Sequence, residues 1–524
     1  MRLRFFGTLM IACQFGTLVG CSGGGSSGIN AAAAIPVAGI GATGLARRAT
    51  STRHNDLTAP TCSGVGSHSF LGDGLANVAA APQSGVMEGG GNSICDAYSA
   101  IVAGAANIVS SSTTTGAQWS MIGAGFSNVI TGTSSTYSFI GAGNGNGIDA
   151  YSDAIGAGTS NVINTGAYES FIGAGNGNTI NLNDSFIGGG NNNTISKVDS
   201  FIGSGVTNSI NAYSSAIAGG QSNTVNANSY GSFIGAGESN AISDDESFIG
   251  GGASNTITAT GSNAFLGGGS TNTLSAQYGV IGGGLNNKVS GEGGYIAAGG
   301  YNTLSGIGAV IDGGFNNTAA GDYGTIPGGY VNSAGGIYSF AAGARASAAQ
   351  TGTFVWSDGS DGDAILTATR AYQFLARASG GFTLWTNAAS TVGATLAPGS
   401  GTWASASDRN MKTNIARVDD AAVLDKVARL PINRWSYITE RGVRHVGPMA
   451  QDFYAAFAVG EDDKHITSID EDGVALAAIK ALHAENAALR ARLATVTVGQ
   501  ARRDAAVQRA LQRLNAKVDA LEPK

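Results

Sequence analysis

The sequence is poor in charged residues, and its middle part is almost free of cations. Charged residues make up 12% of the 524 residues, and between Arg53 and Arg345 the only basic side chains are Lys197 and Lys288. Proteins that bind nucleic acids neutralise phosphates with clustered lysine and arginine. We therefore expect no nucleic-acid partner.

Histidine and cysteine are also scarce, with five and four residues in the whole chain. The histidines cluster neither with the cysteines nor with one another, whereas a metal site needs several such ligands close together. The sequence therefore indicates no metal site, and no motif in it calls for a cofactor. Glycine-rich stretches such as 141–145 imitate phosphate-binding loops, but no helix-forming pattern follows them.

Glycine, by contrast, is abundant, with 83 residues, and it recurs at fixed positions of a short repeat. The repeat is clearest in residues 170–181, Ser-Phe-Ile-Gly-Ala-Gly-Asn-Gly-Asn-Thr-Ile-Asn. An asparagine follows six residues after each repeat isoleucine. A unit this short cannot bury its own apolar face, so the copies must stack into a parallel β-solenoid, a β-roll or β-helix. The isoleucine recurs mostly every 15 residues, with three steps of 17 and one of 18, at Ile122, Ile140, Ile155, Ile172, Ile187, Ile202, Ile217, Ile234, Ile249, Leu266, Ile281, Ile296, Ile311 and Ile326.

An aromatic residue precedes the repeat isoleucine in many copies, as at Phe171, Phe186 and Phe201. Neighbouring side chains of a strand point to opposite faces, so an isoleucine inside the coil places the phenylalanine outside. The reverse arrangement would expose isoleucine instead. Either way an apolar column promotes aggregation unless something covers it, and identical chains would cover it in a symmetric assembly. We therefore expect a homotrimer, with another symmetric bundle of identical chains as the alternative.

The repeat text, Ser-Phe-Ile-Gly-Ala-Gly with a later asparagine, resembles the head repeats of trimeric autotransporter adhesins (YadA-like proteins). The resemblance covers nearly half of the chain and implies a β-roll that functions as a trimer. We interpret the asparagine column as a ladder of side chains that satisfies the turn backbone at one corner of the coil. A row of ligand-binding asparagines is the alternative.

The first 20 residues have the pattern of a bacterial export signal. Arg2 and Arg4 form a charged start, and an apolar run too short to span a membrane stably follows. Residues 18–21, Leu-Val-Gly-Cys, are typical of a lipobox, in which the Cys21 thiol receives a diacylglycerol. We therefore predict a lipid anchor at Cys21 and a location at the cell surface or outer membrane. An ordinary cleaved signal with an incidental cysteine is the alternative.

Two cysteines remain if Cys13 leaves with the signal and Cys21 carries the lipid. An even pair in an oxidising compartment favours a disulfide between Cys62 and Cys95, which would staple the start of the solenoid. Two free buried thiols are the alternative.

Beyond Trp403 the sequence becomes charged and mixed. Its blocks resemble the peptidase S74 family, the intramolecular chaperone domains of phage tailspikes and other β-helical fibres. The resemblance runs from about residue 407 to residue 493. The blocks that carry it are Ser-Asp-Arg-Asn-Met-Lys at 407–412, Val-Gly-Pro-Met-Ala-Gln-Asp-Phe at 446–453, and Ile-Asp-Glu-Asp-Gly-Val-Ala-Leu-Ala-Ala-Ile-Lys at 469–480.

This resemblance implies that the domain cuts its own chain. It assigns the nucleophile to Ser407 and the base to Lys412, and the bond cut is Ala406–Ser407, which frees residues 407–524. A lysine acts as a base near neutral pH only where burial or neighbouring charges lower its pKa. We expect this environment to form only when the trimer has assembled, so that cleavage follows assembly. We expect Asp408 and Arg409 to hold the loop through an ion pair. A domain that chaperones without cutting is the alternative.

A heptad pattern occupies the last part of the chain. Its apolar positions step alternately by 4 and 3 residues, which predicts a coiled coil that brings three chains into register. We expect Thr495 to Gly499 to interrupt the helix. An amphipathic membrane helix is the alternative for the final stretch. The seam consists of Ala475, Ile479, Leu482, Asn486, Leu489, Leu493 and Val496, and it resumes at Val507, Leu511, Leu514, Val518 and Leu521.

The predicted fold is mainly β, a solenoid shaft with a C-terminal α+β chaperone domain and a coiled coil. The expected divisions are a lipoprotein signal peptide (1–20), a flexible tether (21–66), degenerate or capping repeats (67–118), the regular solenoid (119–348), a β-rich transition element (349–405), the peptidase S74 chaperone (406–480) and the coiled coil (481–524).

These features favour a lipid-anchored, trimeric fibre of the bacterial surface, an adhesin or attachment protein with a host or surface receptor. A prophage-derived tail fibre or receptor-binding protein is an alternative, although such a fibre needs no export signal. A structural fibre with a chaperone that does not cleave is another. A shaft that cleaves glycans is a further hypothesis. This chemistry requires paired carboxylates, and no such pair at an insertion between repeats supports it.

Overall fold

The computed structural model describes residues 62–111, 117–132, 135–440 and 442–521. The predicted signal peptide, the lipidation site at Cys21 and the tether up to residue 61 lie outside these residues. The chain forms two compact units, one up to Arg377 and one from Ala378 onward.

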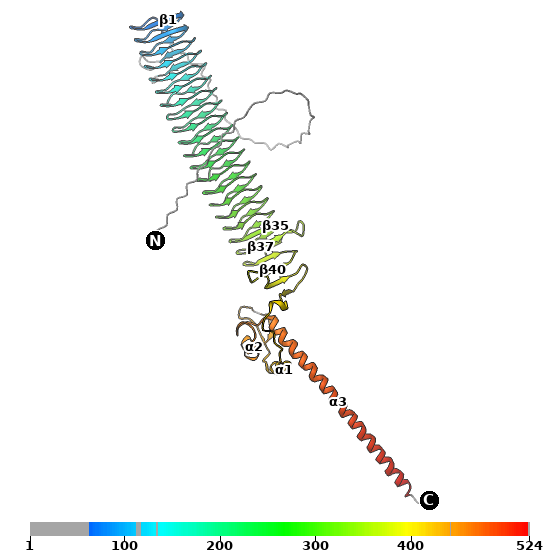
Figure 1. Cartoon of the computed structure of the whole chain (residues 1–524). Coiled ribbons are helices and arrows are strands. Elements are labelled where there is room, and N and C mark those ends of the chain that lie inside the picture. Colours follow the sequence, from blue (N-terminus) through cyan, green and yellow to red (C-terminus); the bar gives the residue numbers. More distant parts are fainter. Residues whose placement is uncertain (1–61, 112–116, 133–134, 441, 522–524) are drawn as a thin grey trace, which may run out of the picture. The chain divides into compact units, whose positions relative to one another are not determined.

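The first unit is a parallel β-solenoid built from very short strands (Figure 1). Odd-numbered strands from β1 to β39 form one 20-stranded sheet, and even-numbered strands from β2 to β38 stack beside each other in the second ladder. Each strand from β5 to β34 has only two or three residues, because glycine-rich corners interrupt the chain on both sides. β13 (Phe171–Ile172) pairs in parallel with β15 (Phe186–Ile187), and β14 (Thr179–Ile180) pairs with β16 (Thr194–Ile195). The predicted fold class is confirmed.

The repeat isoleucines form the core of the coil, and the aromatic residues before them face outward. Ile172, Ile187 and every other repeat isoleucine are fully buried, whereas Phe171 is 38% exposed. The outward rings stack on one another along the solenoid: Phe186 lies 5.3 Å from Phe201, with nearly parallel planes. The prediction that isoleucine lies inside and phenylalanine outside is therefore confirmed.

The asparagine column is a buried side-chain ladder, as predicted. Asn193 is fully buried, and its Oδ1 accepts hydrogen bonds from the backbone N–H and the Nδ2 of Asn208, at 3.0 and 3.1 Å. Its Nδ2 donates to the carbonyl oxygens of Gly189 and Gly205, at 3.0 and 2.9 Å. Each amide thus satisfies the corner of its own coil and joins it to the next coil. The Nδ2 of Asn193 also donates to Asn178 Oδ1 at 3.0 Å. Since all these contacts are internal, the asparagines are structural rather than ligand-binding.

The N-terminal end of the solenoid has longer strands than the middle. β1 (Phe70–Leu75) pairs with β3 (Gly85–Gly90) over five residue pairs, and β2 (Val78–Ala79) pairs with β4 (Ser93–Ile94). The segment expected to hold degenerate repeats therefore forms coils of the same kind, continuing through β5 (Ala100–Ile101) and β6 (Ile108–Ser110). The structure joins Cys62 and Cys95 in a disulfide at this end.

The segment expected to be a transition element divides into two parts. β37 (Phe354–Asp358) and β39 (Phe374–Arg377) continue the parallel ladder of the solenoid, in which β37 pairs with β35 (Phe340–Ala344) of the preceding coil. β40 (Phe382–Trp385), β41 (Gly393–Leu396) and β42 (Trp403–Ser405) instead form an antiparallel sheet and belong to the second unit.

Short helices and one long helix make up the rest of the second unit. α1 (Asp420–Arg429) begins after Asp419, whose side chain accepts hydrogen bonds from the N–H groups of Ala421 and Ala422. β43 (Asn433–Trp435) and β44 (His445–Gly447) form a hairpin, and α2 (Ala450–Phe457) buries Phe453. α3 (Ser468–Asp519) packs against α1, and an ion pair joins Lys480 to Asp420.

The expected interruption of the last helix at Thr495–Gly499 is wrong, because α3 runs unbroken from Ser468 to Asp519. The hydroxyls of Thr495 and Thr497 donate to the carbonyls of Ala491 and Leu493, at 3.0 and 2.8 Å. These hydroxyls therefore bond within the helix rather than competing with it. A single glycine in a helix costs only about 1 kcal/mol, which 52 helical residues tolerate.

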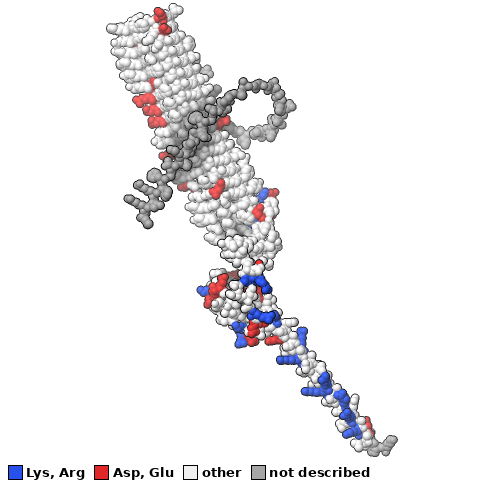
Figure 2. Space-filling model, in the orientation of Figure 1, with Lys and Arg blue, Asp and Glu red and all other residues white. Residues whose placement is uncertain are grey.

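Charge is distributed unevenly between the units. Figure 2 shows isolated acidic side chains on the solenoid and a concentration of Lys and Arg along α3. The lysines and arginines of α3 are Lys480, Arg490 and Arg492 in its first half and Arg502, Arg503, Arg509, Arg513 and Lys517 in its second half.

Candidate functional site

The predicted cleavage site lies directly after an edge strand of the antiparallel sheet. Ala406 follows β42, and its N–H donates to the carbonyl of Gly393 at 3.2 Å. Ser407 is therefore the first residue beyond the last hydrogen bond to this sheet, at a point where the chain is exposed. The scissile peptide bond expected from the sequence lies between an anchored residue and a turn.

A tight 3₁₀ turn, η2 (Arg409–Met411), then brings the chain back toward Ser407. Asp408 caps this turn, since its Oδ1 accepts a hydrogen bond from the N–H of Asn410 at 2.9 Å. The N–H of Lys412 donates to the carbonyl of Arg409 at 3.2 Å, which closes the turn. This turn explains how the side chains of Ser407 and Lys412, five residues apart, come close to each other.

The structure brings the two predicted catalytic side chains into contact. Lys412 Nζ donates a hydrogen bond to Ser407 Oγ at 2.7 Å. A base must lie within about 2.6–3.2 Å of the proton that it removes, so this distance suits proton transfer. Both residues are exposed in the single chain.

The expected ion pair between Asp408 and Arg409 is not present in the part of the chain that the structure describes. The carboxylate of Asp408 faces the backbone N–H of Asn410 instead. A carboxylate at the start of a helical turn satisfies otherwise unbonded N–H groups, which explains why it caps the turn and does not pair with its neighbour. Asp408 therefore shapes the loop through the backbone.

The β43–β44 hairpin carries an aromatic and acidic cluster that sequence reasoning did not identify. The rings of Trp435 and His445 stack with their centres 4.7 Å apart, and Tyr437 lies edge-on to Trp435 at 4.9 Å. His445 Nε2 lies 3.1 Å from Glu440 Oε2. The cross-strand pairing of Trp435 with His445 creates this cluster, and no fixed spacing in the sequence reveals such a pairing.

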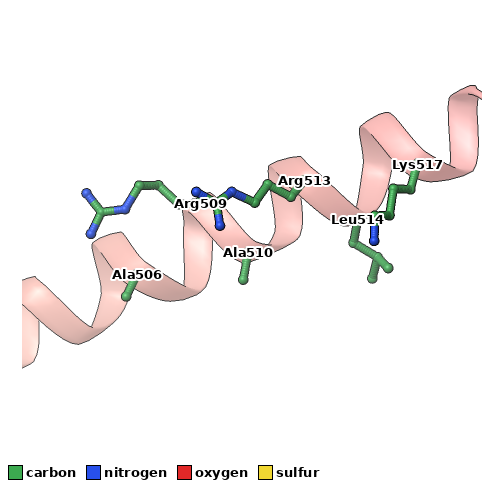
Figure 3. A pocket seen from close by; sticks show the side chains of 6 residues that line it. All are labelled: Ala506, Arg509, Ala510, Arg513, Leu514 and Lys517. Atoms are coloured by element: carbon green, nitrogen blue, oxygen red, sulfur yellow. The ribbon is translucent and has the colours of Figure 1, made fainter.

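The predicted coiled-coil seam of α3 is open in the single chain. Ile479 and Leu493 are 62% and 66% exposed. Figure 3 shows a shallow hollow on the same helix, where Leu514 of the seam lies beside the basic row of Arg509, Arg513 and Lys517. An exposed apolar row of this length requires a partner helix.

The remaining predicted sites belong to other parts of the sequence. Cys21 lies outside the described residues, and the Cys62–Cys95 disulfide lies in the solenoid. Across the described ranges, no group of three or more His, Cys, Asp or Glu is placed to share a metal ion. Among the same residues, no helix combines the length and the apolar character needed to cross a bilayer.

Comparison with known proteins identifies the segment that contains the site. The sequence model of the peptidase S74 family, described as "Chaperone of endosialidase", matches residues 407–459. No curated protein matches the chain. The matched segment begins at Ser407 and includes Lys412, α1, the β43–β44 hairpin and α2, so a β-solenoid precedes an endosialidase-type chaperone segment in this chain.

Proposed function

We propose that this protein is a homotrimeric surface fibre whose C-terminal domain brings three chains into register and then cuts the Ala406–Ser407 bond. The observation that supports the proposal most directly is the 2.7 Å hydrogen bond from Lys412 Nζ to Ser407 Oγ. This pair lies at the start of the segment that matches the peptidase S74 family. Serine activated by a neighbouring base is a recurrent nucleophile in peptide-bond cleavage.

In the proposed reaction, neutral Lys412 removes the proton from Ser407 Oγ, and the oxygen attacks the carbonyl carbon of Ala406. The new C–O bond replaces the C–N bond of the peptide, and the lysine returns the proton to the amino group of Ser407. Water then hydrolyses the ester, which leaves a carboxylate on Ala406 and restores the serine hydroxyl. Backbone N–H groups would stabilise the oxyanion in both steps.

The exposure of Lys412 explains why cleavage would wait for assembly. A lysine becomes a base near neutral pH when burial disfavours its charged form. Lys412 is exposed in the single chain, so the necessary burial has to come from neighbouring chains. A single chain would then remain uncut, whereas the assembled trimer would cut the Ala406–Ser407 bond and release residues 407–524.

We further propose that the fibre is held at the outer membrane by a lipid on Cys21 and serves as an adhesin or attachment protein. The lipobox at residues 18–21 supports this anchor. Incorporation of a palmitate analogue into the wild type but not into Cys21→Ala tests it. Absence of label from both proteins would favour a prophage tail fibre instead.

The cleavage proposal is tested by gel electrophoresis of the purified wild type, Ser407→Ala, Lys412→Ala and Lys412→Arg. We expect only the wild type to release residues 407–524. Arginine keeps the charge and can still donate to Ser407, but it does not lose its proton in proteins. Lys412→Arg therefore separates a base from a side chain that only positions the serine.

Ser405→Ala and Lys426→Ala serve as matched controls, since both residues are exposed and lie in β42 and α1. Both controls should cleave normally. Intact chains in every sample, including the wild type, would indicate a structural fibre whose chaperone does not cut. Cleavage in Lys412→Arg would contradict the role of Lys412 as the base.

A further inference from the structure

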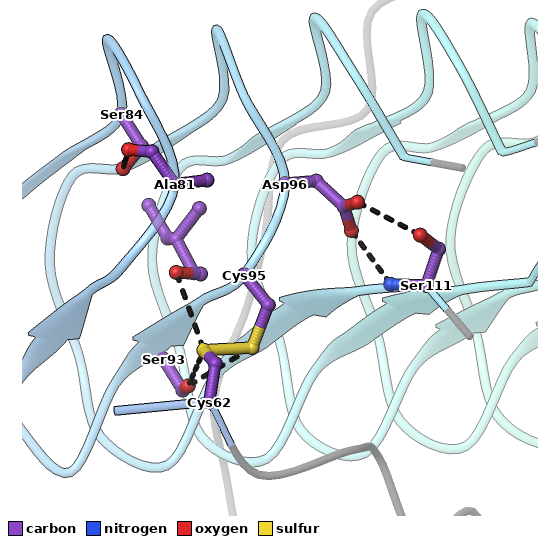
Figure 4. The surroundings of a disulfide bond; sticks show 8 residues. Cys62, Ala81, Ser84, Ser93, Cys95, Asp96 and Ser111 are labelled. Atoms are coloured by element: carbon purple, nitrogen blue, oxygen red, sulfur yellow. Dashed lines mark hydrogen bonds between the residues drawn. A yellow bond between two sulfur atoms is a disulfide. The ribbon is translucent and has the colours of Figure 1, made fainter. Parts of the chain in front are cut away.

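The first coils of the solenoid are held by two different cross-links that lie side by side (Figure 4). The disulfide joins Cys62 to Cys95, which stands 33 residues later and directly after β4. The next residue, Asp96, is buried. Its two carboxylate oxygens accept hydrogen bonds from the N–H and the hydroxyl of Ser111, at 2.6 and 2.8 Å.

These two cross-links act on successive coils. Cys95 and Asp96 end the second coil, which contains β3 and β4, and Ser111 occupies the equivalent place in the third coil, after β6. The disulfide therefore ties the chain at residue 62 to the end of the second coil. The carboxylate then ties that same point to the third coil.

The end of a solenoid is its weakest part under tension. Each coil contacts only its neighbours, so an end coil is bonded on one side and an interior coil on two. β1 shares five residue pairs with β3 on its one bonded side, whereas strands further along the array, such as β13, share two with each neighbour. A chain pulled from its end would thus peel off one coil at a time, breaking few hydrogen bonds in each step.

The disulfide changes where such a pull would act. Tension that arrives at Cys62 passes through the two sulfur atoms to Cys95, so residues 63–94 carry none of it. Cys95 is then loaded first, and its N–H donates to the carbonyl of Val109 in the third coil at 2.9 Å. Asp96 is loaded next, and the pair of hydrogen bonds holds it to Ser111. The next stretch of chain to be extracted belongs to a coil with neighbours on both sides.

The same disulfide also fixes the strand that covers the open edge of the second ladder. Val65 forms a parallel bridge with Ala79 of β2, and the N–H of Gly66 donates to the carbonyl of Ala79 at 2.9 Å. These residues follow Cys62 by only a few positions, so the disulfide keeps them in place while the chain before it is pulled.

We propose that the Cys62–Cys95 disulfide and the Asp96–Ser111 pair form a load-transfer clamp, which carries tension from the N-terminal side past the first two coils into the third. This proposal rests on the proposed lipid anchor at Cys21, through which tension would reach Cys62 in the cell. The mechanical behaviour of the clamp is nevertheless a property of the folded solenoid. A failure of lipid labelling at Cys21 would therefore leave the clamp itself intact and measurable.

The test is single-molecule pulling on one chain of the assembled fibre, from residue 22 to the C-terminus, in a Ser407→Ala background that keeps the chain continuous. Four proteins are compared: the disulfide-bonded form, Cys62→Ser with Cys95→Ser, Asp96→Ala, and the triple variant. We expect the first rupture at the N-terminal end to shift to a higher force in the disulfide-bonded form, because an interior coil is bonded on two sides.

The effect of Asp96→Ala separates a load path from a general gain in stability. We expect it to lower the first rupture force strongly when the disulfide is present. When the disulfide is absent, the first coil peels before Asp96 is loaded, and the same substitution should leave the first rupture force unchanged. Asp73→Ala is the matched control, since Asp73 lies in β1 inside the covalent loop and should have no effect in the disulfide-bonded form.

Two results would overturn the proposal. One is an equal first rupture force with and without the disulfide. The other is an equal loss of force from Asp96→Ala in both backgrounds, which would make the pair a local packing contact. Asp96→Asn, which keeps one side-chain carbonyl as an acceptor, should fall between the wild type and alanine and guards against a variant that misfolds.

Discussion

At the scale of single residues, Asp153 stands at a position that serine occupies in both adjacent coils, at Ser138 and Ser170. Ser138 Oγ donates to the carbonyl of Ala150 at 2.9 Å, whereas Asp153 Oδ1 accepts from the N–H of Ser170 at 2.8 Å. Asp153 Oδ2 is buried and makes no hydrogen bond. Burial raises the pKa of Asp153 from the ordinary value of 3.8 to about 8, and the hydrogen bond from Ser170 offsets only part of this shift. The neutral acid therefore suits this position better than the carboxylate.

This raised pKa predicts that the solenoid loses stability as the pH rises. The folded state binds the proton more tightly than the unfolded state, so the stabilisation is complete below about pH 4 and is lost progressively up to about pH 8. We expect Asp153→Ser to remove this dependence and to be more stable than the wild type by a few kcal/mol at pH 9. Denaturant unfolding at pH 5, 7 and 9 measures the difference.

Asp184→Ser is the control for this prediction, because it removes one carboxylate from an exposed corner of the same array. Its stability should follow the wild type at all three pH values. An unchanged pH profile in Asp153→Ser would show that Asp153 is charged in the folded state.

At the scale of elements, the strands of the solenoid are too short to hold their own register. Two-residue strands such as β16 (Thr194–Ile195) share only two residue pairs with each neighbour. The asparagine ladder adds further hydrogen bonds at each corner, all of them buried and therefore shielded from competition with water. The ladder thus contributes to cohesion between coils as much as the strands do.

The ladder predicts a large local effect of Asn193→Ala. The substitution removes the partner of the Asn208 N–H, and a buried group left without a partner costs about 1–3 kcal/mol. The Gly205 carbonyl loses one of its two donors and keeps the N–H of Asn191. We expect faster hydrogen exchange in the coils on either side of Asn193. Distant coils should exchange as before, because each coil contacts only its neighbours.

Thr194→Ala is the matched control, since it truncates the adjacent, half-buried side chain of the same strand. Exchange near residue 193 should change little in this variant. Equal exchange in Asn193→Ala and Thr194→Ala would mean that the ladder adds little to the strands.

At the scale of the whole molecule, two of the apolar rows formed by the described residues run uncovered along the single chain. One is the stacked phenylalanine column of the solenoid, including Phe186 and Phe201, and the other is the seam of α3 with Ile479 and Leu493. Rows of this kind are rare on soluble chains that lack a partner. Both rows are explained together if three identical chains associate along their length.

This association predicts that charge in the phenylalanine column disrupts assembly. Phe186→Glu with Phe201→Glu places like charges against each other in a symmetric interface, and burial of unpaired charge is costly. We expect the cleaved solenoid of this variant to sediment as a smaller species than the wild-type trimer. Sedimentation equilibrium measures the mass of each.

Tyr278→Glu serves as the control, because Tyr278 is also an exposed aromatic residue but lies at a corner outside the column. It should sediment as the wild type does. A wild-type solenoid that stays folded as a single chain would remove the need for a partner and contradict the trimer.

The periodicity of the sequence determined most of the solenoid in advance. Isoleucine every 15 or 17 residues fixes the core, alternation along a strand sends Phe171 outward, and the asparagine at a constant offset fixes the ladder. Each of these features arises because every repeat packs against the next repeat in the sequence. Residues at equivalent positions of successive repeats are therefore neighbours in the structure. The pairing of Ser407 with Lys412 was predicted from the resemblance to the peptidase S74 family, and a single local turn accounts for their contact.

Other features depend on the tertiary structure, because they arise where the chain meets a segment that no period relates to it. The Trp435–His445 stack requires the pairing of β43 with β44, and α3 continues past Gly499 although the local sequence predicts an interruption there. The buried Asp153 Oδ2 without a hydrogen bond and the hydrogen bond from the Ser111 N–H to Asp96 likewise depend on the three-dimensional surroundings of each carboxylate. A repeat pattern specifies how coils stack, whereas the energy of a side chain that departs from the pattern is set by the particular atoms around it.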